Sequence, residues 1–389
     1  MQGDFHYYAT YCAAYIAGYT HAESRDIAYC SQFTDHCTKT LLKKLKGPLN
    51  AATTQMQTEL INVRSDVVGL QDITRIWASF HFLPYDLNAK LKGLHLKRYM
   101  NRYRLICKPN GPLVEKSVEL AKGQGVQAAG LAMHVLADTW AHSYFAGTPS
   151  NVINNTNSHF FEIRRDGGNE KAVRIAFRHN PAEADDPEHF IYSCSVHQED
   201  ENSIMNLGHG RAGHFPDYSY ARYKYLPAWG DYEEIYKDNP GDYFKAFSQM
   251  VRALKYLRGE LESFSVNEYA DEDIEEYREK IMSILEKRQT DASKDWKAFA
   301  LRLSGHELEP FSIGAHESEY LAAADEEKDA SFLGRYFIAA LAQKSMVTHE
   351  IFESGSLIAG FSVDYRRRGL AGISDFWKVI ADRARRRKR

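Results

Sequence analysis

The sequence predicts a mainly α-helical fold with long loops in its middle and a helical C-terminal part. Three observations indicate this fold class. Apolar residues recur at helical spacing near the start of the chain, and a strong helical pattern covers about 113–145. Helical patterns return after about residue 241, whereas 150–240 is rich in Asn, Asp, Gly, His and Tyr.

The first 35 residues predict two helices. Apolar positions over 5–18 keep the helical period, and Gly18 is a plausible stop. Thr20 and Glu23 form the pattern of a capping box, so a second helix is expected to start at once and to run toward Asp35.

The central helix is expected over about 113–145, because Pro112 precedes it and Gly147 ends it. Glycines within its first half indicate either a close packing contact or a kink, at Gly123, Gly125 and Gly130.

Beyond this helix the chain predicts a small β-hairpin and then more helices. The runs 159–164 and 172–178 are the candidate strands of the hairpin. Helices are expected over roughly 242–262, 268–288, 291–303, 318–345 and 371–386. A soft boundary near residue 240 divides the chain into a helical metal-binding catalytic domain, 1–240, and a helical C-terminal region with a basic tail, 241–389.

The composition is that of a globular protein, with 44% hydrophobic and 26% charged residues among 389. The net charge of −3 argues against nucleic-acid binding by the chain as a whole. Its C-terminal tail is basic, however, and could meet an anionic membrane surface or nucleic acid, or simply be solvated. The basic residues there are Arg366, Arg367, Arg368, Arg383, Arg385, Arg386, Arg387, Lys388 and Arg389.

The five cysteines are odd in number and match no CxxC pattern, which favours a reducing compartment over a disulfide framework. The start of the chain lacks the pattern of a signal peptide, and no run of 18 apolar residues is present. The expected location is cytoplasmic, or one reached by a route that needs no signal peptide.

The spacing of His134, Asp138 and His142 carries the main chemical signal. On an α-helix, three residues at intervals of four lie within about 80° of one face and rise about 6 Å per step. Adjacent members can share one metal ion, and Asp138 can bridge two ions with its two oxygens. A buried hydrogen-bonded network is the alternative, since the helix is also apolar.

Other His and Asp residues strengthen the metal interpretation. Asp4 and His6 stand at the start of the chain, Asp35 ends the second helix, and His81 lies in a Phe-His-Phe run. The glycine-rich segment 208–217 adds three further candidate ligands, His209, His214 and Asp217. Their spacing does not follow a helical period, and the glycines allow a loop to fold its backbone round an ion.

No nucleophile elbow, P-loop, dinucleotide fingerprint or His-Glu-x-x-His motif is present in the sequence. The candidate ligands are nitrogen and oxygen atoms without thiolate, which suits zinc in a catalytic role, or manganese or iron.

These motifs resemble a bacterial family of unknown function, DUF6765. The resemblance rests on Asp-Phe-His-Tyr-Tyr at the start, Ser-Gln-Phe-Thr-Asp at 31–35, Phe-His-Phe at 80–82, the His-x3-Asp-x3-His helix and the Gly-His-Gly-x-x-Gly-His-x-Pro-Asp loop. That family is in turn distantly similar to zinc-dependent phospholipases C and single-strand-specific nucleases, which are all-helical and hold three zinc ions. The resemblance implies a helical phosphoesterase-like core.

Carried over by position, the resemblance implies three sites. Asp35, His81, His134 and Asp138 would hold one zinc; Asp138 and His6 would hold a second; His142, Asp217 and either His209 or His214 would hold a third. Two departures stand out. Those enzymes ligate zinc through an N-terminal Trp that this sequence lacks, so that Asp4 takes its place or the position is empty. The helix spacing to the second His is also shorter.

We therefore expect a metal-dependent phosphodiester hydrolase of phospholipase C type, with Asp138 at its catalytic centre and two or three zinc ions. A single-strand nuclease, or a non-catalytic, metal-stabilised helical adaptor, are the alternatives. Arg211 is a candidate clamp for a phosphate oxygen of a phospholipid or nucleic-acid substrate. Four tyrosines would either line a substrate pocket or pack the core, namely Tyr218, Tyr220, Tyr223 and Tyr225.

Overall fold

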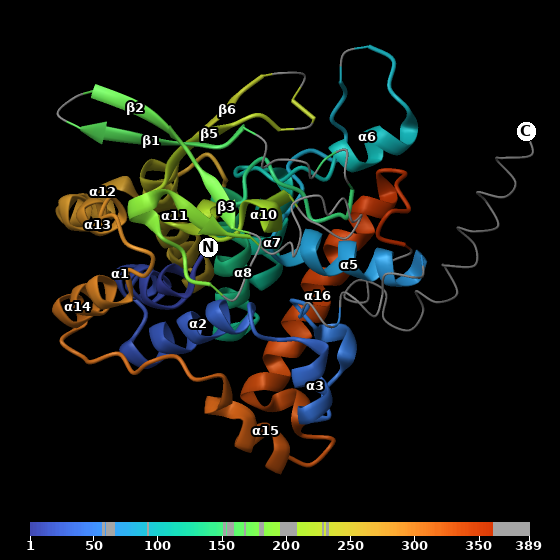
Figure 1. The fold of residues 1–389 in the computed structure, drawn as a ribbon. Helices are drawn as coiled ribbons and strands as arrows, with labels where there is room; N and C mark the ends of the chain where they lie inside the picture. Colours follow the sequence, from blue (N-terminus) through green and yellow to red (C-terminus); the bar gives the residue numbers. More distant parts are fainter. Residues whose placement is uncertain are drawn as a thin grey trace, which may run out of the picture.

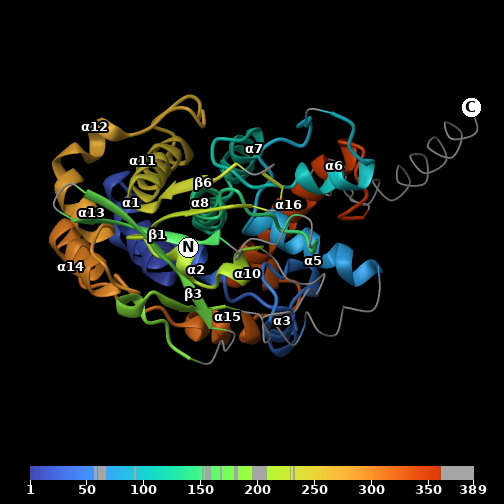
Figure 2. The same ribbon diagram turned by 45° about the horizontal axis from the view of Figure 1, so that its top comes forward.

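The computed structural model describes residues 1–56, 59, 67–91, 93–150, 153, 159–166, 169–178, 183–194, 208–227, 229–230 and 233–360. These residues form a mainly α-helical molecule with a small β-sheet along one side, as the sequence predicts (Figure 1). The sheet and the helices that it covers are also seen from a second direction (Figure 2).

The longer helices carry most of the fold. They are α2 (His21–Phe33), α5 (Val67–Phe80), α7 (Pro112–Ala121), α8 (Gly125–Ala141), α11 (Asn239–Arg258), α14 (Ser293–Ser304) and α16 (Phe332–Glu353). Shorter helices and turns connect them: η1 (Asp4–Ala9), α1 (Thr10–Ile16), α3 (Lys39–Leu45), η2 (Leu49–Ala51), α6 (Lys97–Tyr103), η4 (Pro187–His189), α10 (Gly208–Ala212), η5 (Phe215–Asp217), α12 (Asp271–Ile274), η6 (Glu275–Tyr277), α13 (Arg278–Leu285), η7 (Ile313–His316), α15 (Glu317–Ala322) and η8 (Lys328–Ala330).

Helix α8 lies at the centre and contacts α2, α7, α11 and α16. Its residues from Gln127 to Ala141 are all buried, which is the pattern of a helix enclosed on every side. Gly130 allows the closest approach, because a Cβ there would lie 2.3 Å from the carbonyl oxygen of Ile27 in α2. The two helices that carry candidate ligands are therefore held against each other at a glycine.

The expected helix over 113–145 is interrupted. Gly123 and Gly125 have φ angles of 71° and 85°, which end α7 and let α8 begin in a new direction. The prediction of one continuous helix is therefore wrong. The capping box at Thr20 and Glu23 is present, and α2 begins where the sequence places it.

The C-terminal helices pack onto the same core as the N-terminal ones. One hydrophobic cluster contains Phe5 and Met133 together with Phe247 and Tyr336, so it extends across residue 240. The pattern over 268–288 corresponds to α12, η6 and α13. The pattern over 318–345 is divided between α15 and α16 by residues 323–331. The expected helix over 371–386 and the basic tail lie outside the described residues.

The four-stranded sheet has the order β2-β1-β5-β6, and its paired strands are antiparallel. The strands are β1 (Phe161–Asp166), β2 (Asn169–Arg174), β5 (Arg222–Tyr225) and β6 (Ile235–Asp238). The predicted hairpin is thus present, but its second strand is 169–174. Residues 176–178 instead form β3 (Ala176–Arg178), which pairs in parallel with β4 (Ile191–Ser193).

The four tyrosines of 218–225 are buried in a second hydrophobic cluster around the sheet. Tyr225 stacks on Phe160 with ring centroids 4.6 Å apart, and Tyr223 packs on Phe215 at 5.3 Å. Of the two roles open to these tyrosines, the structure shows the packing role. Within the described residues, no helix is both long enough and apolar enough to cross a bilayer.

Candidate metal centre

Helix α8 presents the His-x3-Asp-x3-His motif from the middle of the fold. The exposed fractions are 0% for His134, 1% for Asp138 and 6% for His142, which is the C-cap residue of the helix. Asp138 Oδ2 lies 3.1 Å from His134 Nε2 and 3.5 Å from His142 Nδ1. The spacing in the sequence therefore does place the three side chains on one face.

A first group forms where α2 and α5 end beside this face. Asp35 follows the end of α2, and His81 directly follows α5. His81 Nδ1 lies 3.1 Å from Asp138 Oδ2 and 3.2 Å from His134 Nε2, and Asp35 Oδ1 lies 3.8 and 3.9 Å from the same two nitrogens. We call Asp35, His81, His134 and Asp138 the first group.

A second group uses the other oxygen of Asp138. His6 lies in the π-helical turn η1, whose backbone geometry is uncommon and is frequent at functional sites. His6 Nε2 is 3.1 Å from Asp138 Oδ1, and the His6 ring stacks on His134 with centroids 4.0 Å apart. The backbone nitrogen of Met1 is 2.7 Å from the same Asp138 oxygen.

A third group lies at the far end of the motif. His209 in α10 and Asp217 in η5 approach His142, with Asp217 Oδ1 3.1 Å from His142 Nε2 and 3.2 Å from His209 Nε2. The Met1 nitrogen lies 3.2 Å from both His142 Nε2 and Asp217 Oδ1, so it stands between the second and third groups.

Backbone carbonyls fix the orientation of two imidazoles. His81 donates from Nε2 to the carbonyl oxygen of Thr53 at 3.0 Å, and His142 donates from Nδ1 to the carbonyl oxygen of His81 at 2.7 Å. In a neutral imidazole the other nitrogen then carries a lone pair. His81 Nδ1 faces Asp138 Oδ2 at 3.1 Å: a protonated ring would donate to this oxygen, and a neutral ring would direct its lone pair at it, which calls for a cation between the two atoms.

Burial and neighbouring charges shift the pKa values of the groups. Burial, together with nearby positive groups, lowers the pKa of His6, His134 and His142 to about 4 in each case, so these imidazoles are neutral at pH 7. Burial alone would raise the pKa of Asp138. His142, the Met1 amine and His134 instead hold it well below its usual range. Neutral imidazoles and ionised carboxylates are the states that bind metals.

Neighbouring groups also stabilise the charged forms of the Met1 amine and Asp217 against the effect of burial. Burial opposes the positive charge of the amine, but the carboxylates of Asp138, Asp217 and Asp35 raise its pKa to about 11. Burial opposes the negative charge of Asp217, but His209 and the Met1 amine hold its pKa well below the usual range.

The groups fit metal ions in both spacing and chemistry. Two ligands of a tetrahedral ion, each at about 2.1 Å, lie about 3.4 Å from one another. The distances within the first group run from 3.1 to 3.9 Å. The donors are imidazole and carboxylate without thiolate. In the described part of the chain, no lysine or arginine forms an ion pair with Asp35, Asp138 or Asp217.

A family model described as a family of unknown function, DUF6765, matches residues 1–351. The chain belongs to DUF6765. All eight clustered side chains of this DUF6765 protein lie within the matched range. No curated protein and no solved structure matches the chain, so the similarity to zinc phospholipases and nucleases stays a prediction.

Three of the residues predicted for the site lie outside the groups of this DUF6765 protein. The carboxylate of Asp4 accepts hydrogen bonds from the backbone of Phe5 at 2.7 Å and of Ala292 at 2.9 Å. His214 is exposed, with Nδ1 4.0 Å from Asp217 Oδ2, so His209 is the histidine that completes the third group. Arg211 is buried in α10, two residues after His209.

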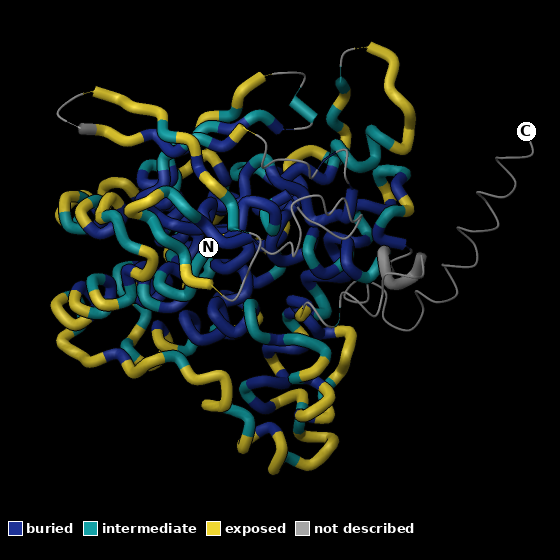
Figure 3. Tube along the Cα trace, in the orientation of Figure 1, coloured by how far each residue is buried: buried dark blue, intermediate teal, exposed yellow. Residues whose placement is uncertain are grey.

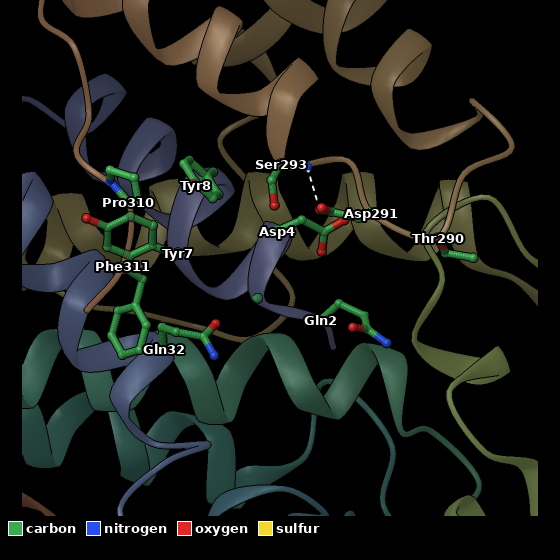
Figure 4. A pocket seen from close by; sticks show the side chains of 11 residues that line it. Gln2, Asp4, Tyr7, Tyr8, Gln32, Thr290, Asp291, Ser293, Pro310 and Phe311 are labelled. Carbon is green, nitrogen blue, oxygen red and sulfur yellow. Dashed lines mark hydrogen bonds between the residues drawn. The ribbon is translucent and has the colours of Figure 1, made fainter. Parts of the chain in front are cut away.

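A cavity of about 370 Å³ is lined by residues of η1, Gln32 and the segments 290–293 and 310–311 (Figure 4). Gln32 lines it and is 6% exposed, and its Nε2 lies 3.5 Å from Asp35 Oδ2. Gln32 Oε1 has no hydrogen-bond partner among the described residues. The side chain of Asp35 is 29% exposed, whereas those of His134 and Asp138 are closed to solvent, so the first group opens at Asp35.

The lining of this cavity is acidic and aromatic. Asp4 and Asp291 face it, with Tyr7, Tyr8 and Phe311, and none of its lining residues is basic. Burial, together with the nearby Asp291, raises the pKa of Asp4 to about 6.

Three further groups contact the clustered side chains and were not predicted from the sequence. They are the Met1 nitrogen, the Thr53 carbonyl and Gln32. The first two are backbone atoms, whose position no side-chain pattern reveals. Gln32 had a signal, because it stands three residues before Asp35 in the Ser-Gln-Phe-Thr-Asp segment at the end of the predicted second helix.

Proposed function

We propose that this protein is a metal-dependent hydrolase of phosphodiesters, with zinc as its metal and a phospholipase C-like reaction. One observation carries the proposal. His81 Nδ1 lies 3.1 Å from Asp138 Oδ2 while His81 Nε2 bonds to the Thr53 carbonyl, within a set of imidazoles and carboxylates at the spacing of metal ligands.

Each group would hold one ion, and Asp138 would join the first two through its separate oxygens. The second-layer hydrogen bonds from His81 and His142 keep their ligand nitrogens directed at these positions. Bound zinc would lower the pKa of a water molecule toward neutrality and offset the charge that grows on phosphate oxygens.

The partial exposure of Asp35 favours a catalytic site over a closed, structural one. A structural zinc site is fully ligated by protein, whereas a catalytic site keeps a position open. The side chain of Asp35 is 29% exposed, and Gln32, whose Nε2 lies 3.5 Å from Asp35 Oδ2, lines the cavity. Because the lining carries Asp4 and Asp291 and no basic residue, we infer that the cavity receives a neutral or cationic part of the substrate, while the phosphate stays at the metal centre.

Single-strand nuclease activity and a non-catalytic, metal-stabilised adaptor are the rival functions. The acidic lining beside the first group disfavours a long polyanion lying across this opening. An adaptor would hold metal ions ligated only by protein and would not hydrolyse any phosphodiester.

The test combines metal analysis with turnover. Protein purified without chelator is analysed for metal, then assayed on bis(p-nitrophenyl) phosphate, on phosphatidylcholine and on single-stranded DNA and RNA. We expect bound zinc and hydrolysis of diesters. His81→Ala should lose diester hydrolysis together with the ion of the first group, and should keep the ion of the third group, which does not include His81. His189→Ala is the matched control, because His189 pairs with Asp186 at 2.7 Å on the surface. Bound metal with no turnover of any diester would favour the adaptor.

The role of Arg211 needs its own variant. If it clamps a phosphate oxygen, Arg211→Ala will lose diester turnover while keeping its metal content. Full activity in Arg211→Ala would remove the clamp from the proposal.

A further inference from the structure

Shortly after His81, the chain forms a segment that projects from the core between Pro84 and Cys107. Pro84 and Cys107 pair in an isolated bridge, and the Tyr85 backbone donates to the carbonyl oxygen of Ile106 at 3.1 Å. Between these points the chain extends outward and returns through α6. Figure 1 shows this segment projecting beyond the rest of the molecule, at the upper right.

Residues 93–98, in the outer part of this projecting segment, are exposed, and we call them the leucine loop. Figure 3 shows the exposed backbone of this projection in yellow. Leu94 and Leu96 are 104% and 80% exposed, whereas no other large hydrophobic residue among those described exceeds 48%. Two neighbouring leucines held fully in water indicate a surface that meets an apolar partner.

Basic residues stand on both sides of the two leucines in the sequence. Lys90, Lys97 and Arg98 are exposed, and none of them forms an ion pair with a described residue. Asp86 is the only acidic residue of the sequence between 85 and 108, a stretch that holds seven lysines and arginines. A partner that covers this surface must therefore be both anionic and apolar.

Aromatic residues stand at the base of the loop. Tyr99 and Tyr103 of α6 pack at a small cluster with Trp229, and the His95 ring stacks on Tyr99 with centroids 5.5 Å apart. An arrangement of apolar tip, basic flank and aromatic base matches the layers of a bilayer surface, from acyl chains to headgroups.

We propose that the leucine loop docks the protein on an anionic lipid bilayer. Leu94 and Leu96 enter the acyl region, and Lys90, Lys97 and Arg98 contact anionic headgroups. Nucleic acid would satisfy the charges but would leave both leucines against a phosphate backbone. This inference goes beyond the proposed hydrolase function and does not depend on it.

Both the basic residues and the leucines should contribute to vesicle affinity. A lysine or arginine near an anionic surface contributes about 1 kcal/mol, so reversing two of them weakens binding by about 30-fold or more. Removing two leucines that enter the acyl region weakens it by at least about tenfold.

The experiment is co-sedimentation of the full chain with vesicles of phosphatidylcholine, alone or mixed equally with phosphatidylglycerol. The full chain keeps the basic tail in every variant. We expect binding to the mixed vesicles and far weaker binding to phosphatidylcholine alone. Leu94→Ser/Leu96→Ser and Lys97→Glu/Arg98→Glu should each lose affinity by the factors above.

Matched controls lie away from α6. Leu301 in α14 is 47% exposed, and Lys43 and Arg335 are exposed without an ion pair among the described residues. Leu301→Ser and Lys43→Glu/Arg335→Glu should bind the mixed vesicles as the unmodified chain does. The proposal is overturned if the loop variants bind like the controls, or if only the charge reversal weakens binding. It is also overturned if the loop variants lose affinity for a single-stranded oligonucleotide but not for vesicles.

Discussion

The substitution Asp138→Asn should remove most of the stabilisation that zinc gives to the fold. One oxygen of Asp138 serves the first group and the other serves the second, at 3.1 Å from His81 and from His6. Even residues outside the ligand shell weaken metal binding by about 10–100-fold when changed, so loss of a shared ligand charge should exceed about 100-fold at both positions.

The magnitude follows from linkage. At zinc about 100 times above Kd, each ion stabilises the fold by about 2.7 kcal/mol, so two ions give about 5 kcal/mol. The unfolding entropy is about 2.1 cal/mol/K per residue, which for a chain of 389 residues makes 1 kcal/mol worth about 1.2 °C. Zinc should therefore raise the Tm of the unmodified chain by about 6 °C from these two positions and by about 3 °C from the third group, and only the rise of about 3 °C should remain in Asp138→Asn.

The assay is a thermal melt with zinc and with chelator. Glu162→Gln is the matched control, because Glu162 is 2% exposed and pairs with Arg288 away from the centre. It should lower the Tm in both conditions and keep the zinc-dependent difference. An equal zinc response in Asp138→Asn and the unmodified chain would refute the shared role of Asp138.

Three further predictions concern other parts of the structure. His209→Ala should lower the metal content by one ion per chain, because the first two groups do not include His209; loss of all metal in elemental analysis would contradict separate groups. Gly130→Ala should destabilise the fold by about 1–3 kcal/mol, since its Cβ would meet the Ile27 carbonyl at 2.3 Å; an unchanged Tm would argue against this helix contact. Burial lowers the pKa of Lys344 from 10.5 to about 8, so the unfolded chain binds more protons between these values and stability rises with pH there. Between pH 8 and 10.5 the unfolding free energy of the unmodified chain, measured relative to Lys344→Met by urea denaturation, should rise by about 3 kcal/mol. A difference that stays constant with pH would contradict the lowered pKa of Lys344.

The sequence predicts the helical class and much of the site because their signals are local. The period of apolar residues locates α2 and α11, and the spacing of four places His134, Asp138 and His142 on one face. The approach of His6, His81 and Asp217 to that face depends on how distant segments pack, so their common position could only be inferred from residue type and resemblance.

What the sequence did not predict is set by tertiary contacts and backbone geometry. The division between α7 and α8 arises from positive φ angles at Gly123 and Gly125, although the apolar period continues through them. The choice of His209 over His214 depends on which one α10 buries beside His142. The pairing of β3 with β4 depends on residues 176 and 191 meeting in space, which strand patterns alone do not specify.

The most direct test of the metal centre is anomalous X-ray diffraction at the zinc edge, from crystals of protein purified without chelator. We predict anomalous peaks about 2.1 Å from Asp138 Oδ1 and from Asp138 Oδ2, with another between His142, His209 and Asp217. A map without a peak at Asp138, in which His81 Nδ1 and Asp138 Oδ2 still stand 3.1 Å apart, would contradict it and leave a hydrogen-bonded network in place of a metal site.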